Sequence, residues 1–439
     1  MRVLFLLLLF FFTQINFAQI LSEKDRATLK DELLEDRFQN LLPQLMDDAN
    51  LDMWLLISRE YNEDPVLKTM LPSTWLNARR RTIIVFYRNK EKQTIERLAV
   101  ARYDIGKSIK SAWNKEKEPN QWKALSDIIA ERNPEKIGVN YSKHFPLADG
   151  LVKTDHEELT QNLPDSLTSK LVSAEKLAVA WIETRTEKEI QLFEKLVKIT
   201  HDIIDEAFSN KVITPGETTT DDVVWWMRQK VTDLGLETWF HPTVDIQRNK
   251  EALKSHIESF SKSKEDKAIQ KGDLLHCDFG ITYIGLNTDC QQHAYVLKDD
   301  ESKVPQYLVN AFKKGNQLQD ILTKNMKEGS TGNEILLSSL TEAKQNGLRP
   351  SIYTHPLGKY GHSAGTTIGM WDSQEGVPVR GDYPLHKNTA YAIELNVTVN
   401  IPEWQKDIRI MLEEAGLFGD NIFRYVNERQ TAIKPIKTN

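Results

Sequence analysis

The run Leu274-Leu275-His276-Cys277-Asp278-Phe279-Gly280 is followed by Gly285-Leu286-Asn287-Thr288-Asp289, and each run sets an aspartate at one end of an apolar segment. We expect two strands, over 273–284 and 289–296, that form a hairpin. In a simple antiparallel register Asp278 pairs with Asp289, so that both carboxylates lie side by side on one face. Two such carboxylates repel each other and raise one pKa, unless a cation lies between them. Taken alone, the pair is better explained by one Asp that caps the turn and one that is solvated.

Three further residues make the pair a candidate metal site. His362 lies in a Gly-rich segment, where backbone and ligand can approach closely. Glu394 lies inside an apolar strand-like run, and Glu413 ends a second one, whereas Glu414 falls on the opposite strand face. A buried carboxylate is costly without a partner. Four carboxylates and one imidazole suit two divalent ions, with some carboxylates bridging them.

The ordered set Asp, Asp, His, Glu, Glu resembles the ligands of the pita-bread (M24-type) metallopeptidases, in the branch of Xaa-Pro aminopeptidase and Xaa-Pro dipeptidase (prolidase). The resemblance implies that Asp278 binds one metal and that Asp289 and Glu413 bridge both. His362 and Glu394 would hold the other ion, with Glu394 also assisting the attacking water. Two divalent ions are expected as cofactors, and Mn, Co, Zn and Fe all suit these ligands.

One feature departs from the family pattern, in which a second His follows the ligand His by seven residues. Near that place the sequence has Trp371, two residues later than expected. An indole donates one hydrogen bond but cannot shuttle a proton. We expect this catalytic role to pass to His355, seven residues before His362, or to another group. His256, upstream of the first Asp, is a candidate substrate-facing residue and could equally be a surface residue.

The chain is predicted to form two unequal domains, one over 19–175 and one over 176–439. Strands interleaved with helices favour an α/β class for the first domain, and helices with hairpin-connected strands favour α+β for the second. The family resemblance implies a pita-bread catalytic domain preceded by a smaller domain of the creatinase and prolidase type. The predicted helices are 22–50, 122–131, 184–208, 218–234, 305–325 and 331–346. Further predicted strands are 53–57, 82–87, 98–103, 136–141, 390–399 and 408–413.

Residues 1–18 have the pattern of a secretory signal peptide: a charged start, an apolar run and a small residue, Ala18, before Gln19. A buried N-terminal helix or strand is the alternative. The apolar run is too short to span a bilayer. We therefore expect an exported protein, in the periplasm or the medium, with no membrane span once the signal is removed.

Composition and cysteines limit the remaining possibilities. The 439 residues carry a formal net charge of -6, which gives no indication of a nucleic-acid partner. Only two cysteines are present, so a disulfide scaffold is excluded. In the register that pairs the two aspartates, Cys277 opposes Cys290. Either a cross-strand disulfide or, somewhat favoured, two small buried thiols would fit.

These observations predict an exported dinuclear metallopeptidase that cleaves Xaa-Pro bonds through a metal-bridging water. Its partners would be peptides with proline at the second position, and the resemblance suggests a homodimer. One alternative is a metal-binding family member with weak or no catalysis, because the second His is missing. Another is a hydrolase of non-peptide amides.

Overall fold

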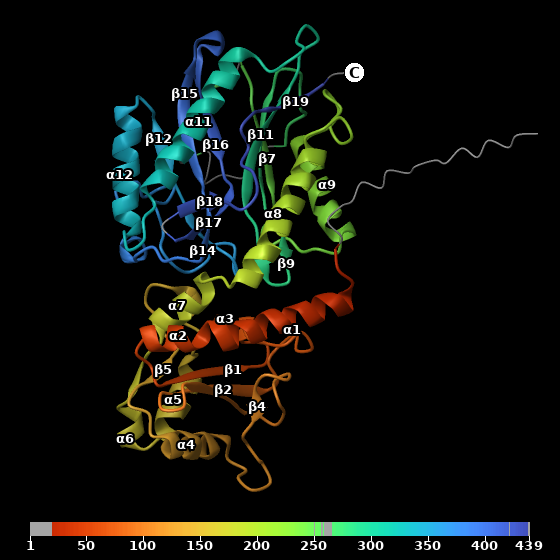
Figure 1. Ribbon diagram of the computed structural model, residues 1–439. Helices are drawn as coiled ribbons and strands as arrows, with labels where there is room; N and C mark the ends of the chain where they lie inside the picture. Colours follow the sequence, from red (N-terminus) through yellow and green to blue (C-terminus); the bar gives the residue numbers. More distant parts are fainter. Residues whose placement is uncertain (1–19, 250, 256–257, 259–265, 421, 438–439) are drawn as a thin grey trace, which may run out of the picture.

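The computed structural model describes residues 20–249, 251–255, 258, 266–420 and 422–437 (Figure 1). The predicted signal segment, 1–18, and His256 lie outside the described residues. In Figure 1 the N-terminal part of the chain lies below and the C-terminal part above, with α7 and α8 passing between them. The predicted α+β class with a preceding α/β domain is confirmed.

The lower part is built on one six-stranded sheet with helices on both faces. In β1 (Met53–Arg59) the even-numbered apolar residues contact one core and the odd-numbered ones the other, which explains its unbroken apolar run. The sheet order is β4-β3-β2-β1-β5-β6, with β2 (Arg81–Asn89), β3 (Thr94–Val100), β4 (Lys110–Ser111), β5 (Ile137–Val139) and β6 (Leu171–Ser173). One face packs on α1 (Glu23–Asn40), α2 (Leu42–Asp48) and α3 (Pro65–Thr69), and the other on α4 (Gln121–Arg132), α5 (Lys153–Asn162) and α6 (Asp165–Thr168).

Helix α7 (Glu175–Glu183) starts at the predicted domain boundary and packs against the lower sheet. Its Leu177 and Trp181 belong to the same core as α1 and α2. The next helix, α8 (Glu187–Ala207), begins after Thr186, whose side chain forms a capping box with Glu189. The change from the lower to the upper core therefore lies between these two helices.

In the upper part, a four-stranded sheet and a three-stranded sheet meet at an isolated bridge between Gln291 and Glu413. The first sheet has the order β19-β11-β8-β7, with β7 (Thr243–Gln247), β8 (Leu274–Phe279), β11 (Cys290–Val296) and β19 (Lys434–Ile436). The second has the order β12-β15-β16, with β12 (Pro350–Ile352), β15 (Leu395–Ile401) and β16 (Lys406–Leu412). A further sheet joins β13 (His355–Leu357), β14 (Thr389–Ala392), β17 (Ala415–Gly419) and β18 (Ile422–Tyr425).

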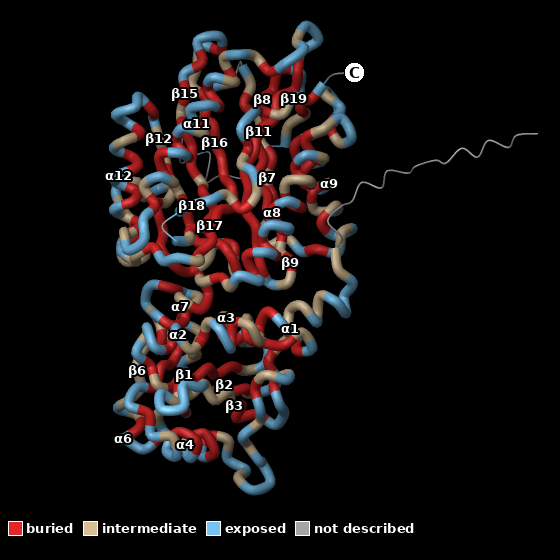
Figure 2. Tube along the Cα trace, viewed as in Figure 1, coloured by how far each residue is buried: buried red, intermediate tan, exposed pale blue. Residues whose placement is uncertain are grey.

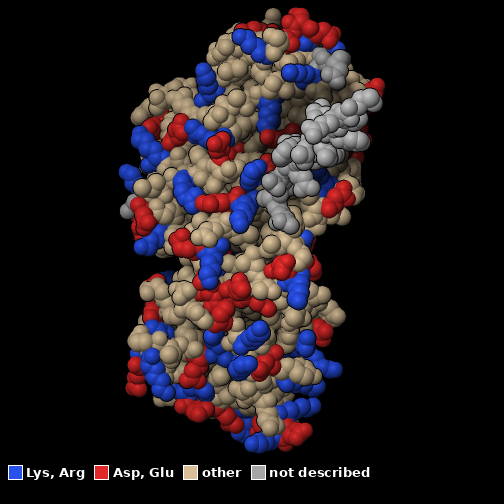
Figure 3. All heavy atoms as spheres, turned by 45° about the vertical axis from the view of Figure 1, so that its right-hand side comes forward, with Lys and Arg blue, Asp and Glu red and all other residues tan. Residues whose placement is uncertain are grey.

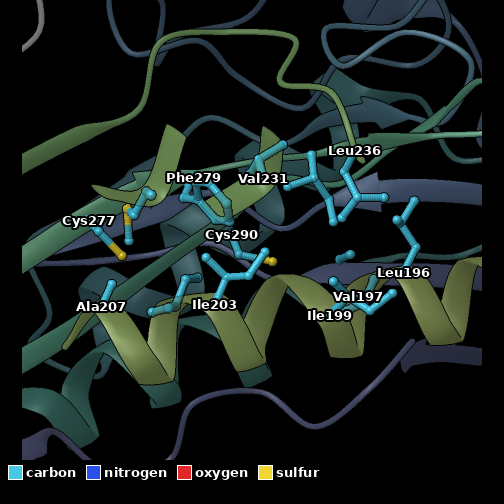
Figure 4. Packing of buried hydrophobic residues seen from close by; sticks show 14 of the residues in the cluster. Leu196, Val197, Ile199, Ile203, Ala207, Val231, Leu236, Cys277, Phe279 and Cys290 are labelled. Atoms are coloured by element: carbon cyan, nitrogen blue, oxygen red, sulfur yellow. The ribbon is translucent and has the colours of Figure 1, made fainter. Parts of the chain in front are cut away.

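Helices cover one face of each of the two sheets that meet at the Gln291–Glu413 bridge. Cys277 and Phe279 of β8 point toward α8 (Figure 4), and α9 (Thr220–Asp233) extends the same core. The apolar residues of β15 and β16 pack in the same way with α11 (Gln306–Asn325) and α12 (Gly332–Gln345). Because strand side chains alternate, His276 and Asp278 face away from α8. The polar side chains of both sheets therefore share the uncovered faces, where the site lies.

Burial is concentrated in these strands and in the helix faces that touch them (Figure 2). Lys and Arg are interspersed with Asp and Glu over the face shown in Figure 3, which narrows between the two parts of the molecule. Among the described residues, none of the helices is long and apolar enough to cross a bilayer.

Two predicted strands are interrupted at their acidic residues. The predicted strand 390–399 breaks after Ala392 and resumes at Leu395, so that its halves belong to different sheets. The predicted strand 408–413 ends at Leu412, and β17 resumes at Ala415 in the other sheet. Glu394 and Glu413 therefore lie at the crossings between sheets, where side chains of both can converge.

The predicted hairpin register is wrong by two residues. Asp278 opposes Gln291 instead of Asp289, and Cys290 opposes Phe279 instead of Cys277. The cause is the position of the turn: Ile284 and Gly285 both have a positive φ, and β9 (Thr282–Tyr283) and β10 (Leu286–Asn287) on its two sides pair in the same register as β8 and β11. A disulfide is excluded in the structure, in which both cysteines are free and buried, as the alternative interpretation expected.

Candidate metal centre

Four carboxylates converge where the upper sheets meet. Asp278 lies near the end of β8, Asp289 directly precedes β11, and Glu394 and Glu413 lie at the crossings described above. Carboxylate oxygens of Asp278, Asp289 and Glu413 lie within 4.8 Å of one another. Glu394 and Glu413 form a second such group with His355. The offset register still brings both aspartates together because they flank the same connection.

Electrostatics make this cluster unfavourable without a cation. Burial, together with the neighbouring carboxylates, raises the pKa of Asp289, of Glu394 and of Glu413 well above its usual value. Glu413 Oε1 and Asp289 Oδ1 are buried and accept no hydrogen bond from the described residues. Oxygen atoms of this kind, on several carboxylates at once, fit divalent ions. The residues present therefore fit the metal that the sequence predicts.

His355 lies in the carboxylate cluster. Its Nδ1 is 3.0 Å from the carbonyl oxygen of Pro356, to which it can donate, and its Nε2 is buried without a hydrogen-bond partner among the described residues. Nε2 lies 3.5 Å from Glu413 Oε1 and 3.8 Å from Asp289 Oδ2. Burial, reinforced by His362, lowers the pKa of His355 to about 3. A neutral imidazole with its lone pair toward carboxylates is the form that binds a metal.

His362 lies beside His355, on the exposed side of the carboxylate cluster. Its ring packs edge-on against that of His355, with centroids 4.8 Å apart, and against Trp239, at 5.2 Å. A ring nitrogen comes within 4.8 Å of ligand atoms of Asp289 and His355, and the side chain is exposed. The structure thus brings His355 close to both glutamates and His362 to the open edge, whereas the sequence predicted His362 as the ligand.

The spacing of the two histidines bears on the predicted departure from the family pattern. His362 follows His355 by seven residues, the interval that the family has between its ligand His and its second His. Trp371, which was expected at that second position, instead lines a pocket that includes Thr398 and Arg409. His355 and His362 are therefore separated by the interval that the resemblance implies for the ligand His and the second His.

The sequence interpretation missed two residues beside the site. Gln291 donates from Nε2 to Glu394 Oε1 at 2.7 Å and to Glu413 Oε2 at 2.9 Å. Trp239 donates to the carbonyl oxygen of Thr288 at 2.8 Å, and its ring lies where a Cβ at Gly361 would come within 2.4 Å. Gln291 could have been found by alternation from Asp289, whereas Trp239 carries no such signal.

Glu414 and His293, which also lie near these strands, have hydrogen-bond partners away from the carboxylate cluster. Glu414 faces away from Glu413, as the strand period predicts, and accepts from His201, Gln292 and the backbone of Gln430. His293 is buried; its Nδ1 donates to Leu275 O at 2.9 Å, and its Nε2 accepts from the backbone N–H of Met411 at 3.0 Å. These groups have structural partners and no role at the carboxylate cluster.

Comparison with solved structures shows the same two-part architecture elsewhere. X-Pro aminopeptidase from Thermotoga maritima MSB8 aligns with a TM-score of 0.63 at 16% identity, over 90% of this chain and 100% of that one. Xaa-Pro dipeptidase from Bacillus anthracis gives 0.57 at 16% identity, over 93% and 100%. Prolidase from Pyrococcus horikoshii OT3 gives 0.55 at 16% identity, over 91% and 99%. These likenesses establish the pita-bread fold with its N-terminal domain.

A comparison with curated proteins returned no match. The sequence profile of metallopeptidase family M24, in contrast, matches residues 191–414, just over half of the 439 residues. The matched region contains all four clustered carboxylates and both histidines. The chain belongs to metallopeptidase family M24.

Proposed function

We propose that this peptidase holds two divalent ions and hydrolyses Xaa-Pro bonds at the N-terminus of peptides or in dipeptides. The observation that carries the proposal is the convergence of four carboxylates, three of which lie near a neutral, buried His355. Structures whose names specify X-Pro aminopeptidase, Xaa-Pro dipeptidase and prolidase share the fold over nine-tenths of this chain or more, which supports that substrate class.

The geometry suggests a role for each residue. Asp278 would bind one ion, Asp289 and Glu413 would bridge both, and His355 with Glu394 would hold the other. Divalent ions in such a site supply an acidified water and polarise the scissile carbonyl. Gln291 donates to Glu394 Oε1, so Glu394 Oε2 would face the ion, and the Glu394 carboxylate would also assist the attacking water. His362, at the open edge, would donate a hydrogen bond to the oxyanion that develops on the substrate.

The proposal is tested by peptide hydrolysis. Purified protein lacking residues 1–18 would be loaded with Mn, Co or Zn and offered Ala-Pro, Ala-Pro-Pro, Ala-Ala and Met-Ala, with Glu394→Ala as the blank. We expect cleavage of the Xaa-Pro peptides alone, and its loss in the blank. Cleavage of Ala-Ala and Met-Ala at the same rate would contradict the proposed specificity.

An inactive metal-binding member is one alternative, motivated by Trp371 near the place of a second His. The interval of seven residues between His355 and His362 supports the active peptidase over this alternative. Hydrolysis of non-peptide amides stays an alternative, which the same assay decides by including an aliphatic amide.

We further propose export of the protein and assembly as a homodimer. Export is supported by the pattern of residues 1–18, and N-terminal sequencing of the protein from its native compartment would test it. A start at Gln19 is expected, and an intact Met1 would contradict export with cleavage. Native mass measurement tests the dimer, which is supported only by the family resemblance.

A further inference from the structure

We propose that Gln291 is a positioning residue of the metal centre, whose side-chain amide holds Glu394 and Glu413 in the geometry that binds the ions. The proposal deepens the proposed function and rests on it. It assigns to a residue of β11 a task that neither the ligand pattern nor the family match describes.

The first support is the contact geometry of the amide. Both N–H bonds of Gln291 Nε2 are used, one on Glu394 Oε1 at 2.7 Å and one on Glu413 Oε2 at 2.9 Å. The backbone adds two hydrogen bonds between Gln291 and Glu413, at 2.9 and 3.3 Å. Gln291 is only 3% exposed, so its side chain has little freedom to release the two carboxylates.

The second support is that the amide is itself held from behind. A carboxylate only accepts hydrogen bonds, so the amide must turn its nitrogen toward the glutamates and its oxygen toward His276. His276 Nε2 lies 3.0 Å from that oxygen and is therefore the protonated nitrogen of the pair. The hydrogen bonds from His276 to Gln291 and from Gln291 onward thus end on the two glutamates.

The third support is where the glutamates lie. Both are at crossings between sheets, where the ladder of regular strand hydrogen bonds is interrupted, so a side-chain contact adds to what the backbone fixes. Gln291 occupies one oxygen of each and leaves Glu394 Oε2 and Glu413 Oε1 for the ions. Residues that orient metal ligands in this way typically contribute about 10–100-fold to metal affinity.

The neighbouring residue offers a matched control. Gln292 lies in the same strand, is also 3% exposed, and donates from Nε2 to Glu414 Oε1 at 3.1 Å. It differs in facing Glu414, which lies outside the carboxylate cluster. Gln292→Met removes a buried amide–carboxylate bond of the same kind, and Gln291→Met does so at the metal centre, with little change in side-chain volume.

The experiment is calorimetric titration of Mn²⁺ into metal-free wild-type protein and both variants, with thermal unfolding of each metal-free protein. We expect the Kd for Mn²⁺ to rise about 10–100-fold in Gln291→Met and to stay within about twofold in Gln292→Met, although both lower the Tm. An unchanged Kd in Gln291→Met, or equal rises in both variants, would overturn the proposal.

A second variant covers the case in which Gln291→Met does not fold. His276→Phe leaves the amide in place but removes the donor behind it, and we expect a severalfold rise in the Kd for Mn²⁺. If Gln291→Met does not fold, an unchanged Kd in His276→Phe overturns the proposal. A wild-type protein that binds no Mn²⁺ contradicts the proposed function itself, which is distinguishable from a variant that binds as tightly as the wild type.

Discussion

Lys359 Nζ lies 2.8 Å from Glu189 Oε1 in a buried ion pair that ties the loop between His355 and His362 to helix α8. The other oxygen of Glu189 lies 2.7 Å from Arg37 of α1. Burial opposes the ionisation of Glu189, but the charges of Arg37, Lys359 and Arg185 outweigh it and hold its pKa well below the usual range. One carboxylate thus connects the N-terminal part of the chain to the histidine loop.

Replacing Lys359 should therefore affect both stability and the site. We expect Lys359→Met to lower the free energy of unfolding by about 3–5 kcal/mol, because it leaves a buried carboxylate short of a partner. Urea unfolding measures this directly. Lys198→Met is the control, since Lys198 pairs with Asp202 on the exposed side of the same helix, and a loss below about 1 kcal/mol is expected there. Equal losses in both variants would contradict the prediction that the buried Lys359–Glu189 pair contributes more to stability than an exposed pair.

The raised pKa of Glu183 predicts that its contribution to the free energy of unfolding falls as the pH rises, whereas the contribution of Glu189 increases with pH. Burial, opposed by Arg185, raises the pKa of Glu183 to about 8. The unfolded chain has a Glu pKa near about 4.3, so the folded protein binds the extra proton between these two values. The contribution of Glu183 to stability is therefore full below about pH 4.3, falls by at most about 1.4 kcal/mol per pH unit above it, and levels off above pH 8.

The variant Glu183→Gln isolates this effect because the amide stays neutral. We expect it to match the wild type well below about pH 4.3, where the wild-type carboxyl is protonated in both states. Near pH 8 it should be more stable than the wild type. Urea unfolding across this range measures the difference, and a difference that stays constant with pH would contradict the assigned titration.

The two histidines should separate binding from turnover. We expect His355→Ala to weaken Mn²⁺ binding about 10-fold or more, because it removes a ligand with its lone pair toward the carboxylates. His362→Ala should leave the Kd for Mn²⁺ nearly unchanged and reduce kcat on an Xaa-Pro peptide about 10²–10³-fold, as expected for loss of an oxyanion donor. Calorimetry and initial rates on the same preparations check both. The opposite pattern would restore His362 as the ligand.

The close approach of Gly361 to Trp239 allows a further test of the loop that carries His362. A Cβ there would lie 2.4 Å from the indole of Trp239, which the loop carrying His362 packs against. We expect Gly361→Ala to reduce kcat/KM while Trp239→Phe combined with it restores part of the activity. Failure of the second substitution to restore any activity would show that the clash is not the cause.

The carboxylates of the site could be predicted because each interrupts an apolar run. Glu394 and Glu413 stand out in segments that are otherwise buried, and alternation distinguishes Glu413 from Glu414. The long helices could be predicted for a related reason: α8 has a wide apolar face and a capping box at Thr186. These patterns involve residues that are close in sequence, so contacts between distant segments do not change them.

What the sequence did not reveal depends on contacts between distant segments. The register of β8 with β11 is shifted by two residues because the turn lies at Ile284 and Gly285, and a positive φ at an isoleucine is not indicated by the sequence. His355 lies in a strand of three residues that is placed by pairing with Ala392 of β14. A Gly-rich segment was the stronger local signal, so His362 was chosen instead. Gln291 carries no charge and so gives no signal apart from alternation.

The central claim, that Asp278, Asp289, His355, Glu394 and Glu413 hold two divalent ions, is tested most directly by anomalous diffraction from crystals grown with Mn²⁺. We expect two anomalous peaks among the four carboxylates, one of them within bonding distance of His355 Nε2, and His362 outside bonding distance of both. A single peak, no peak, or a peak coordinated by His362 in place of His355 would contradict the account.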